Sequence, residues 1–285
     1  MTFGGVHALD LPSGRLEWRA PGLVGIVNVT PDSFSGAGGF STTEQAVSAG
    51  LRLRDEGAIM IDVGGESTRP GAEPVAEGEE LRRVLGVVEA LAAAGVVVSV
   101  DTRKQAVAAA ALDSGAALIN DVGGLRDAGM RAACAAAGAA AIIMHMQGEP
   151  STMQEAPSYT DVVAEVEEFL LRQARVAAAA GVRGVVLDPG IGFGKDVRHN
   201  LALLRATKRF ASLGYPVMVG ASRKGFIGRL SGEADPRARL PGTLAAHLWA
   251  AASGAALLRV HDVAAHAQAL AVWGAIDSED LETGE

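Results

Sequence analysis

The sequence of 285 residues has a single cysteine, and only 4% of its residues are aromatic. One cysteine, Cys134, excludes an intrachain disulfide, and its alanine-rich surroundings give no sign of an activated thiol. The scarcity of aromatic residues argues against a sugar site, which usually has aromatic platforms. It also means that alanine, valine and leucine must fill the core.

An excess of positive charge is also missing. The net charge of −8 makes the chain a poor general nucleic-acid binder, although a local basic pocket for an anion is compatible with it. No apolar run approaches the length of a membrane span, and the first residues lack the basic and apolar parts of a signal peptide. We therefore expect a cytoplasmic protein that binds neither nucleic acid nor membrane.

Recognisable metal and nucleotide motifs are absent as well. No cluster of His, Cys and Asp has zinc spacing, and no glycine-rich segment matches a P-loop. The segment GIGFGK is not a dinucleotide fingerprint, because it does not occupy the first strand–helix turn of a Rossmann unit.

What the sequence does contain is one repeated pattern, in which a short aliphatic run ends at a polar or small residue and a helical stretch follows. The runs span residues 23–28, 58–62, 96–101, 116–121, 140–145, 184–188, 216–220 and 255–261. Strands that alternate with helices form a parallel sheet, and eight such units in one chain of this length predict a (β/α)8 TIM barrel. A doubly wound open sheet is the alternative, but no linker marks its two halves.

The two ends of the chain fall outside this repeat. Residues 1–22 contain a Ser-Gly turn between two short extended pieces, which predicts a hairpin over the N-terminal mouth, or bottom, of the barrel. Residues 275–285 are acidic and predict a frayed tail. We expect residues 1–285 to form one domain, in which several helices close on a glycine: Gly57, Gly95 and Gly115.

Polar residues gather at the predicted strand ends, where a barrel builds its active site. Arg259 and His261 share one face of the last strand, because side chains alternate between faces. A buried arginine needs an anionic partner, and its fork suits phosphate. The segment after strand seven adds Ser222 and Lys224 before a helix start, so an anion site is predicted there. In the structural alternative, Arg259 pairs with Asp262 or with a barrel carboxylate.

Carboxylates and amides follow other strands. Asp101, Asn120 and Asp188 could grip a ring that bears N–H donors and a carbonyl, such as an aminopyrimidinone. Acid–base chemistry of the glycosidase kind is the alternative for the carboxylates, and capping of the turn before Pro189 is the structural alternative for Asp188. Asn28, at the end of strand one, could hold a hydrated Mg²⁺ through its carbonyl.

Long loops follow strands one and two. NVTPDSFSGAGGF and GGESTRPGAEPV exceed a tight βα connection, which predicts loops that close over a substrate. His145 stands between Met144 and Met146, which we expect to line a pocket or to pack. The histidines on helix-like segments are expected to be structural or solvated: His199, His247 and His266.

Together these segments resemble the dihydropteroate synthase family. The matching pieces run in family order from Gly25 to Val263: NVTPDSFS, DVGGESTRPG, VSVDT, INDV, MHMQGEPSTMQ, LDPGIGFGK, GASRKGFIG and LPGTLAAHLWAAASGAALLRVHDV. The resemblance implies a barrel enzyme that condenses 6-hydroxymethyl-7,8-dihydropterin diphosphate with 4-aminobenzoate. It would release diphosphate and form 7,8-dihydropteroate, a folate precursor, and sulfonamides would compete with the aminobenzoate.

The resemblance also implies a role for each residue of the site. The pterin would contact Asp101, Asn120, Met144, Asp188, Phe193, Gly220 and Lys224. The diphosphate would contact Asn28 with Mg²⁺, Arg259 and His261. The aminobenzoate would lie against Phe34, Thr68, Arg69 and Pro70, with its carboxylate near Ser222. The catalytic residues would be Asp101, Asp188, Lys224, Arg259 and His261.

One position departs from the family pattern. The first loop of the family commonly reads DSFSDGG, whereas this chain reads DSFSGAGG, so Gly36 replaces a second acidic residue and Asp32 remains. A catalytically weak or silent pterin-binding paralogue is one alternative interpretation. A methyltetrahydrofolate-type pterin methyltransferase domain is another, although no cobalamin module accompanies the barrel. Because the family often forms homodimers, we also expect a homodimer.

Overall fold

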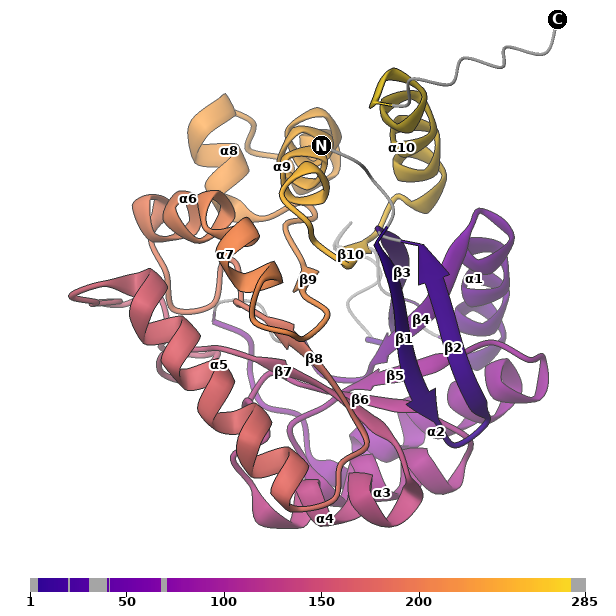
Figure 1. Cartoon of the computed structure of the whole chain (residues 1–285). Helices are drawn as coiled ribbons and strands as arrows, with labels where there is room; N and C mark the ends of the chain where they lie inside the picture. The colour runs from indigo at the N-terminus through magenta and orange to yellow at the C-terminus, as the bar shows by residue number, and fades with distance from the viewer. Residues whose placement is uncertain (1–4, 20, 31–39, 41, 68–70, 278–285) are drawn as a thin grey trace, which may run out of the picture.

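Eight parallel strands form a closed barrel at the centre of the molecule (Figure 1). The computed structural model describes residues 5–19, 21–30, 40, 42–67 and 71–277. The barrel strands are β3 (Gly22–Asn28), β4 (Ala58–Gly64), β5 (Val98–Asp101), β6 (Leu118–Asp121), β7 (Ala140–Met144), β8 (Gly184–Asp188), β9 (Met218–Val219) and β10 (Leu257–Val260). They pair in the order β8-β7-β6-β5-β4-β3-β10-β9.

The first and last strands of this order also meet. Leu187 and Val217 form a parallel bridge, and the Leu187 N–H donates to the carbonyl of Pro216 at 2.9 Å. The sheet therefore closes on itself. The predicted TIM barrel is confirmed, and the doubly wound alternative is wrong because an open sheet has two unpaired edges.

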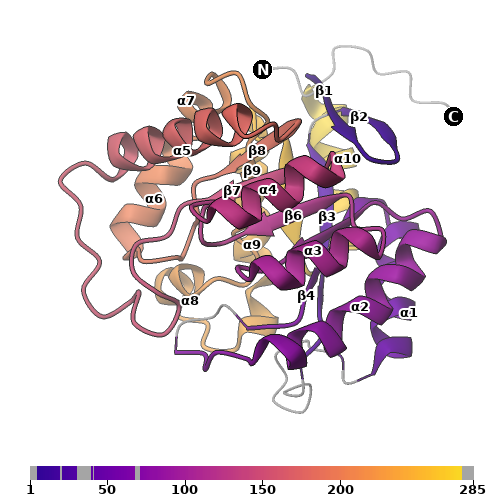
Figure 2. The same ribbon diagram turned by 90° about the horizontal axis from the view of Figure 1, so that it is seen from below.

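Helices separate the strands and surround the barrel (Figure 2). They are α1 (Thr43–Asp55), α2 (Glu77–Ala93), α3 (Gln105–Asp113), α4 (Ala128–Ala137), α5 (Val162–Ala179), α6 (Val197–Arg205), α7 (Thr207–Ala211), α8 (Gly225–Ser231), a 3₁₀ turn at Pro236–Arg239, α9 (Leu240–Ala252) and α10 (Val263–Asp277). Gly57, Gly95 and Gly115 follow α1, α2 and α3 with positive φ, as predicted for helix ends. Helix α10 extends through Asp277, so the first three residues of the predicted tail are helical. No helix of the described ranges is long and apolar enough to cross a membrane.

The alternation of side chains along each strand produces two apolar layers. Met60, Leu118, Val186 and Leu257 belong to the layer inside the barrel. Their sequence neighbours on the strands, such as Ile61, Ile119, Leu187 and Leu258, pack against the helices outside. This two-residue period decides which polar residues at the strand ends point into the barrel.

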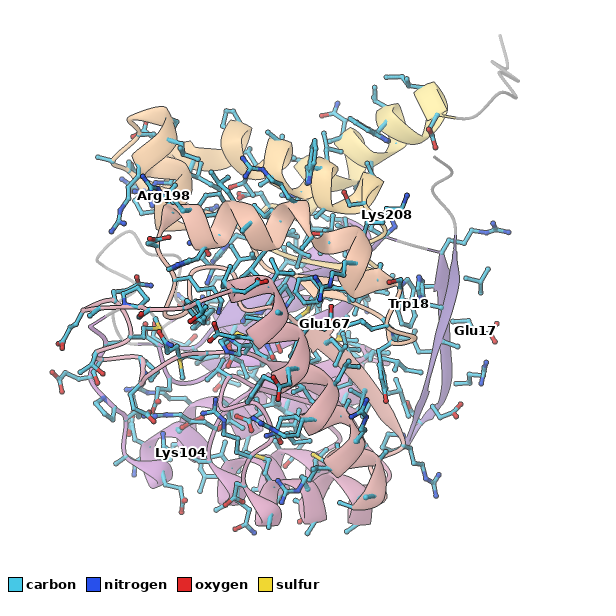
Figure 3. All side chains as sticks on the ribbon, turned by 60° about the vertical axis from the view of Figure 1, so that its left-hand side comes forward. Glu17, Trp18, Lys104, Glu167, Arg198 and Lys208 are labelled. Atoms are coloured by element: carbon cyan, nitrogen blue, oxygen red, sulfur yellow. The ribbon has the colours of Figure 1, made fainter. Side chains whose placement is uncertain are left out.

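A hairpin closes the bottom of the barrel. Strands β1 (Val6–Leu11) and β2 (Gly14–Arg19) pair antiparallel, and Leu9, Leu11 and Trp18 join the inner apolar layer. The Trp18 indole N–H donates to the carbonyl of Ala256 at 2.9 Å. Trp18 faces the barrel and Glu17 faces away from it (Figure 3). The predicted N-terminal hairpin is therefore present.

Candidate active site

The strand period places four polar residues inside the top of the barrel. Asp62, Asn120, Asp188 and Arg259 each follow an inner-layer residue by two positions: Met60, Leu118, Val186 and Leu257. Asp101 is the last residue of β5. Its side chain also points into the barrel, because its neighbour Val100 belongs to the outer layer. The sequence brings these side chains together because parallel strands end at one edge of the barrel.

Arg259 lies between two of the buried carboxylates. Its Nε donates to Oδ2 of Asp62 at 2.6 Å, and its Nη2 donates to Oδ2 of Asp101 at 2.9 Å. Asp62 also accepts a hydrogen bond from the Asn120 amide at 3.0 Å. Arg259 thus contacts two barrel carboxylates, the pairing that the structural alternative expected, whereas Asp262 pairs with Arg223 instead. The Arg259 guanidinium supplies the positive charge that these buried acids require.

Burial makes two carboxylates of this cluster, Asp101 and Asp188, harder to ionise. It raises the pKa of Asp101 from 3.8 to about 7, against the attraction of Arg259, and the charge of Asp62 adds to the rise. Burial also raises the pKa of Asp188, although the Gly190 N–H donates to its Oδ1 at 2.7 Å. Acids with raised pKa values in a strand-end cluster are typical of functional sites.

Three buried oxygens of this cluster accept no hydrogen bond from the residues that the structure describes. They are Oδ1 of Asp62, Oδ1 of Asp101 and Oδ1 of Asn120. They lie on three neighbouring strands, since β4 pairs with β5 and β5 with β6. A ligand that brings several N–H donors would satisfy them, because buried polar atoms rarely stay unpaired.

An apolar surface and a cation lie beside the acids. Met144 and Phe193 belong to one buried cluster, and the Nζ of Lys224 lies 4.0 Å from the centre of the Phe193 ring. Gly220 leaves space between two site residues: an added Cβ would lie 4.0 Å from Oδ2 of Asp188 and 3.7 Å from Cβ of Arg259. These residues place an apolar surface beside the charged groups of the site.

His261 and Ser222 form the next part of the site. The Oγ of Ser222 lies 2.9 Å from Nδ1 of His261 and accepts the His261 backbone N–H at 3.2 Å. The sequence assigned Ser222 to the aminobenzoate, but its contact is with a residue assigned to the diphosphate. Arg223 donates to both oxygens of Asp262, at 3.1 and 2.6 Å, and this pair also joins the ends of β9 and β10.

Asn28 lies beside the acids at the end of β3. A Cβ added to Gly64 would lie 3.5 Å from Oδ1 of Asn28 and 3.9 Å from Oδ2 of Asp101. The candidate metal-ligand atoms near this point are oxygens, which Mg²⁺ prefers. The described ranges contain no group of three or more His, Cys, Asp or Glu residues that could hold a metal ion.

Several expectations concern residues outside the described ranges. They are the aminobenzoate assignments Phe34, Thr68, Arg69 and Pro70, and the loop positions Asp32 and Gly36. The two long loops carry all of these residues.

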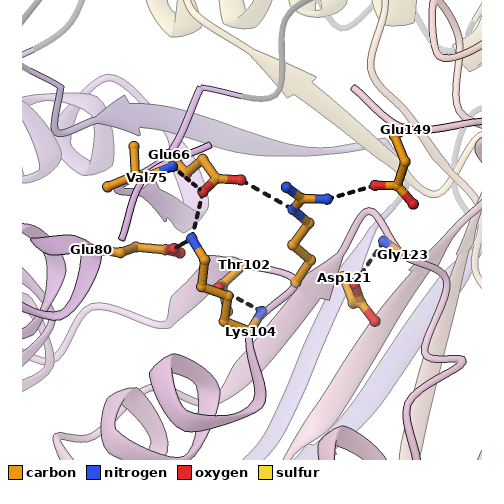
Figure 4. A network of polar contacts seen from close by, with 9 residues as sticks. Glu66, Val75, Glu80, Thr102, Lys104, Asp121, Gly123 and Glu149 are labelled. Atoms are coloured by element: carbon orange, nitrogen blue, oxygen red, sulfur yellow. Dashed lines mark hydrogen bonds and ion pairs between the residues drawn. The ribbon is translucent and has the colours of Figure 1, made fainter. Parts of the chain in front are cut away.

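The sequence interpretation missed a polar network beside the second loop (Figure 4). Glu66 is buried and accepts from the Val75 N–H at 2.9 Å, from Arg103 at 3.1 Å and from Lys104. Lys104 also donates to Glu80, and Arg103 donates to Glu149 at 2.7 Å. The network ties both ends of the loop after β4 to the loops after β5 and β7. The only signal in the sequence was the position of Glu66 after a strand end.

A second missed residue is Lys195, in the GIGFGK segment. Its Nζ is buried and donates to the Nδ1 of His145 at 3.0 Å, to the His145 carbonyl at 3.1 Å and to the Phe193 carbonyl at 2.9 Å. Burial lowers the pKa of His145 to about 3, so its ring is neutral and can accept this bond. Burial also lowers the pKa of Lys195 to about 7. Met144 and Met146 pack in one buried cluster, as the sequence predicted.

Comparison with known proteins assigns the chain to a class and then to a family. A model of pterin-binding enzymes matches residues 24–261. Together with the barrel and its buried acids, this match defines a pterin-binding enzyme. The chain is 45% identical over 260 residues to the dihydropteroate synthase of Escherichia coli (strain K12), an alignment that covers 90% of this chain and 92% of that protein. The chain belongs to the dihydropteroate synthase family.

Solved structures agree with this assignment. Dihydropteroate synthase from Thermus thermophilus in complex with 4-aminobenzoate is 50% identical, with a TM-score of 0.86 and coverage of 95% of this chain and 100% of that one. The enzyme from Xanthomonas albilineans in complex with 7,8-dihydropteroate is 45% identical, with a TM-score of 0.85 and coverage of 96% and 100%.

Proposed function

We propose that this protein is a transferase that condenses 6-hydroxymethyl-7,8-dihydropterin diphosphate with 4-aminobenzoate to give 7,8-dihydropteroate and diphosphate. The observation that carries the proposal is the cluster of Asp62, Asp101 and Asn120 around Arg259, with three oxygens that accept no hydrogen bond from any residue in the described ranges. The ligands of the Thermus and Xanthomonas enzymes, 4-aminobenzoate and 7,8-dihydropteroate, support the same reaction.

The pterin binds against the acids through its N–H groups. The aminopyrimidinone edge donates to Asp101 and Asp188 and contacts Asn120, while its flat face lies on Met144 and Phe193. Lys224 and Gly220 border the same space. Ionised acids hold the ring best, because a carboxylate accepts from two adjacent N–H groups at once.

The diphosphate binds at the ends of β3 and β10. Two of the five N–H donors of Arg259 go to Asp62 and Asp101, and the others suit a phosphate. His261 lies two residues further on the same strand face. Asn28 would hold Mg²⁺ through its amide oxygen, and the ion, when bound, neutralises charge on the departing diphosphate.

The reaction exchanges one bond for another at the pterin methylene carbon. The bond to the diphosphate oxygen breaks, the amine nitrogen of 4-aminobenzoate forms the new C–N bond, and that nitrogen loses a proton. Arg259, His261 and Lys224 stabilise the charge that grows on the leaving group, and Asp101 and Asp188 stabilise positive charge on the ring. The neutral arylamine needs orientation more than a strong base. We assign its binding to Phe34, Thr68, Arg69 and Pro70, with Ser222 near its carboxylate.

One assay separates this function from its alternatives. Diphosphate release is measured with the pterin diphosphate, Mg²⁺ and 4-aminobenzoate, and with each substrate omitted in turn. Release that needs both substrates, and that a sulfonamide inhibits competitively with 4-aminobenzoate, supports the synthase. Binding of the pterin diphosphate without release would instead establish a silent paralogue with Gly36 in its first loop.

We also propose that the protein is a homodimer joined through its last helices. Trp249 on α9 is 56% exposed, and Val272 and Ile276 on α10 are 58% and 79% exposed. Large exposed apolar side chains on two neighbouring helices are typical of a protein interface.

A further inference from the structure

Helix α9 holds the backbone of the segment that carries Ser222 and Lys224. The N–H of Ala221 donates to Nε2 of His247 at 2.9 Å, and the N–H of Arg223 donates to Oγ1 of Thr243 at 3.0 Å. Thr243 and His247 are four residues apart, so they share one face of α9. Both side chains are completely buried. The N–H groups of Ala221 and Arg223, two positions apart in this segment, are therefore held by two side chains of one helix.

The segment needs such support because its backbone is strained. Arg223 has a φ of 59°, in the left-handed region that residues other than glycine rarely adopt. A conformation of this kind persists only where the surroundings impose it, and it often marks a functional site. Besides Thr243 at its N–H, Arg239 donates to the carbonyl of Arg223 at 3.1 Å. Both sides of the strained residue are thus fixed.

His247 continues the support to the other half of the anion site. Its Nδ1 lies 2.8 Å from Nε2 of His266, and Nδ1 of His266 lies 2.7 Å from the carbonyl of Asp262. The backbone groups at the two ends of this chain of hydrogen bonds determine the tautomers of the histidines. The Ala221 N–H can only donate, and the Asp262 carbonyl can only accept. Each ring therefore accepts at Nε2 and donates at Nδ1, and both histidines are neutral. Burial, which lowers the pKa of both rings, agrees with this assignment.

The two ends of this chain of bonds flank the anion-binding residues. Ala221 precedes Ser222 and Lys224 in the sequence, and Asp262 follows His261. We propose that Thr243, His247 and His266 are positioning residues, which set the distance and orientation between the Ser222–Lys224 segment and the Arg259–His261 segment for a diphosphate. This inference rests on the proposed function, and it extends that function to buried residues that do not touch the substrate.

Matched substitutions of His247 test the proposal. In His247→Gln the side-chain amide reaches the position of Nε2 and keeps an acceptor for the Ala221 N–H. In His247→Asn it reaches only the position of Nδ1 and leaves that N–H buried without a partner. Inorganic pyrophosphate is titrated by calorimetry into the full chain with Mg²⁺ present, and 6-hydroxymethylpterin, which lacks the diphosphate, is titrated separately. We expect His247→Asn to weaken pyrophosphate binding about tenfold or more. His247→Gln keeps the bond to the Ala221 N–H and loses only the donor to His266, so it should weaken pyrophosphate binding less, and pterin affinity should change less than pyrophosphate affinity in both variants.

Thr243 provides an independent pair if His247→Asn does not fold. Thr243→Val removes the acceptor for Arg223 and should weaken pyrophosphate binding, whereas Thr243→Ser keeps it. Equal pyrophosphate affinity within each pair, or an equal loss for pyrophosphate and pterin, would overturn the positioning role. Failure of the wild-type protein to bind pyrophosphate would instead overturn the proposed diphosphate site itself.

Discussion

At the scale of single residues, Arg259 has two roles that one substitution would expose. It contacts the buried acids Asp62 and Asp101, and we assign it to the diphosphate. The sequence alone predicts that Arg259→Ala cripples substrate binding and turnover and leaves the fold nearly intact. The structure changes the second half of that expectation, because the variant leaves two buried carboxylates without their cation.

We expect Arg259→Ala to lower kcat/KM by about 100-fold or more and to lower the free energy of unfolding by about 3–5 kcal/mol. Arg259→Lys keeps the charge but loses the fork, so it should recover stability better than activity. Urea unfolding and steady-state kinetics measure the two effects separately. Full activity in the alanine variant would refute the diphosphate assignment, and an unchanged free energy of unfolding would refute the counter-ion role.

Asp101 gives the site a pH dependence. Its raised pKa of about 7 means that the carboxylate form, which binds the pterin N–H groups, becomes dominant only above neutral pH. We expect kcat/KM for the pterin diphosphate to rise between about pH 5.5 and about pH 8.5, with a midpoint near pH 7. Measured rates across this interval check it. A flat profile would show that Asp101 is ionised throughout or is not needed.

The same shift affects stability with the opposite sign. In the unfolded chain Asp101 titrates near 3.8, so between pH 3.8 and about 7 the folded protein binds more protons than the unfolded one. The contribution of this group to the free energy of unfolding is therefore fully present below pH 3.8 and is lost as the pH rises through about 7. Activity and this part of stability thus favour different ends of the pH range.

At the scale of elements, the β1–β2 hairpin stabilises the barrel from the end opposite to the site. Trp18 is buried in the inner apolar layer and donates to the Ala256 carbonyl. We expect Trp18→Ala to lower the free energy of unfolding by about 3–5 kcal/mol, and Trp18→Phe, which mainly loses the hydrogen bond, by about 1–3 kcal/mol.

Urea unfolding measures these changes, and the neighbouring exposed residue supplies the control. Glu17→Ala should change the free energy of unfolding by less than about 0.5 kcal/mol. The activity of each folded molecule should stay at the wild-type value in all three variants. If Trp18→Ala were as stable as Glu17→Ala, the hairpin would not seal the barrel.

The elements themselves were largely predictable from the sequence. A buried parallel strand is a continuous aliphatic run, so each of the eight runs marked a strand. Strand β9 is shorter than the predicted run of residues 216–220, because it contains only Met218–Val219. Pro216 has no N–H to donate, and the predicted strand residue Gly220 already belongs to the segment that leads into the site.

At the scale of the whole molecule, the sequence predicted the position of the site better than its contacts. The two-residue period and the common edge of parallel strands place Asp101, Asn120, Asp188 and Arg259 together. The sequence could name a barrel carboxylate as a partner of Arg259, but it could not say which one. Asp62 is 197 residues away, and nothing local selects it over Asp262. The histidines on α9 and α10 were expected to be structural or solvated. Their link between two strand ends depends on helix packing that no local pattern encodes.

Assembly is the remaining question at this scale, and the exposed apolar residues of the last helices provide its test. We expect the protein to sediment as a species of twice the chain mass at micromolar concentration, with Ile276 and Val272 covered by the second copy. Val272→Glu and Ile276→Glu together should shift it to the monomer, because an unpaired charge at a buried apolar contact is costly.

Val6→Glu is the matched control, since Val6 is 65% exposed but lies on the hairpin. Analytical ultracentrifugation measures the masses. A monomeric wild-type protein, or equal dissociation by the control, would exclude this interface.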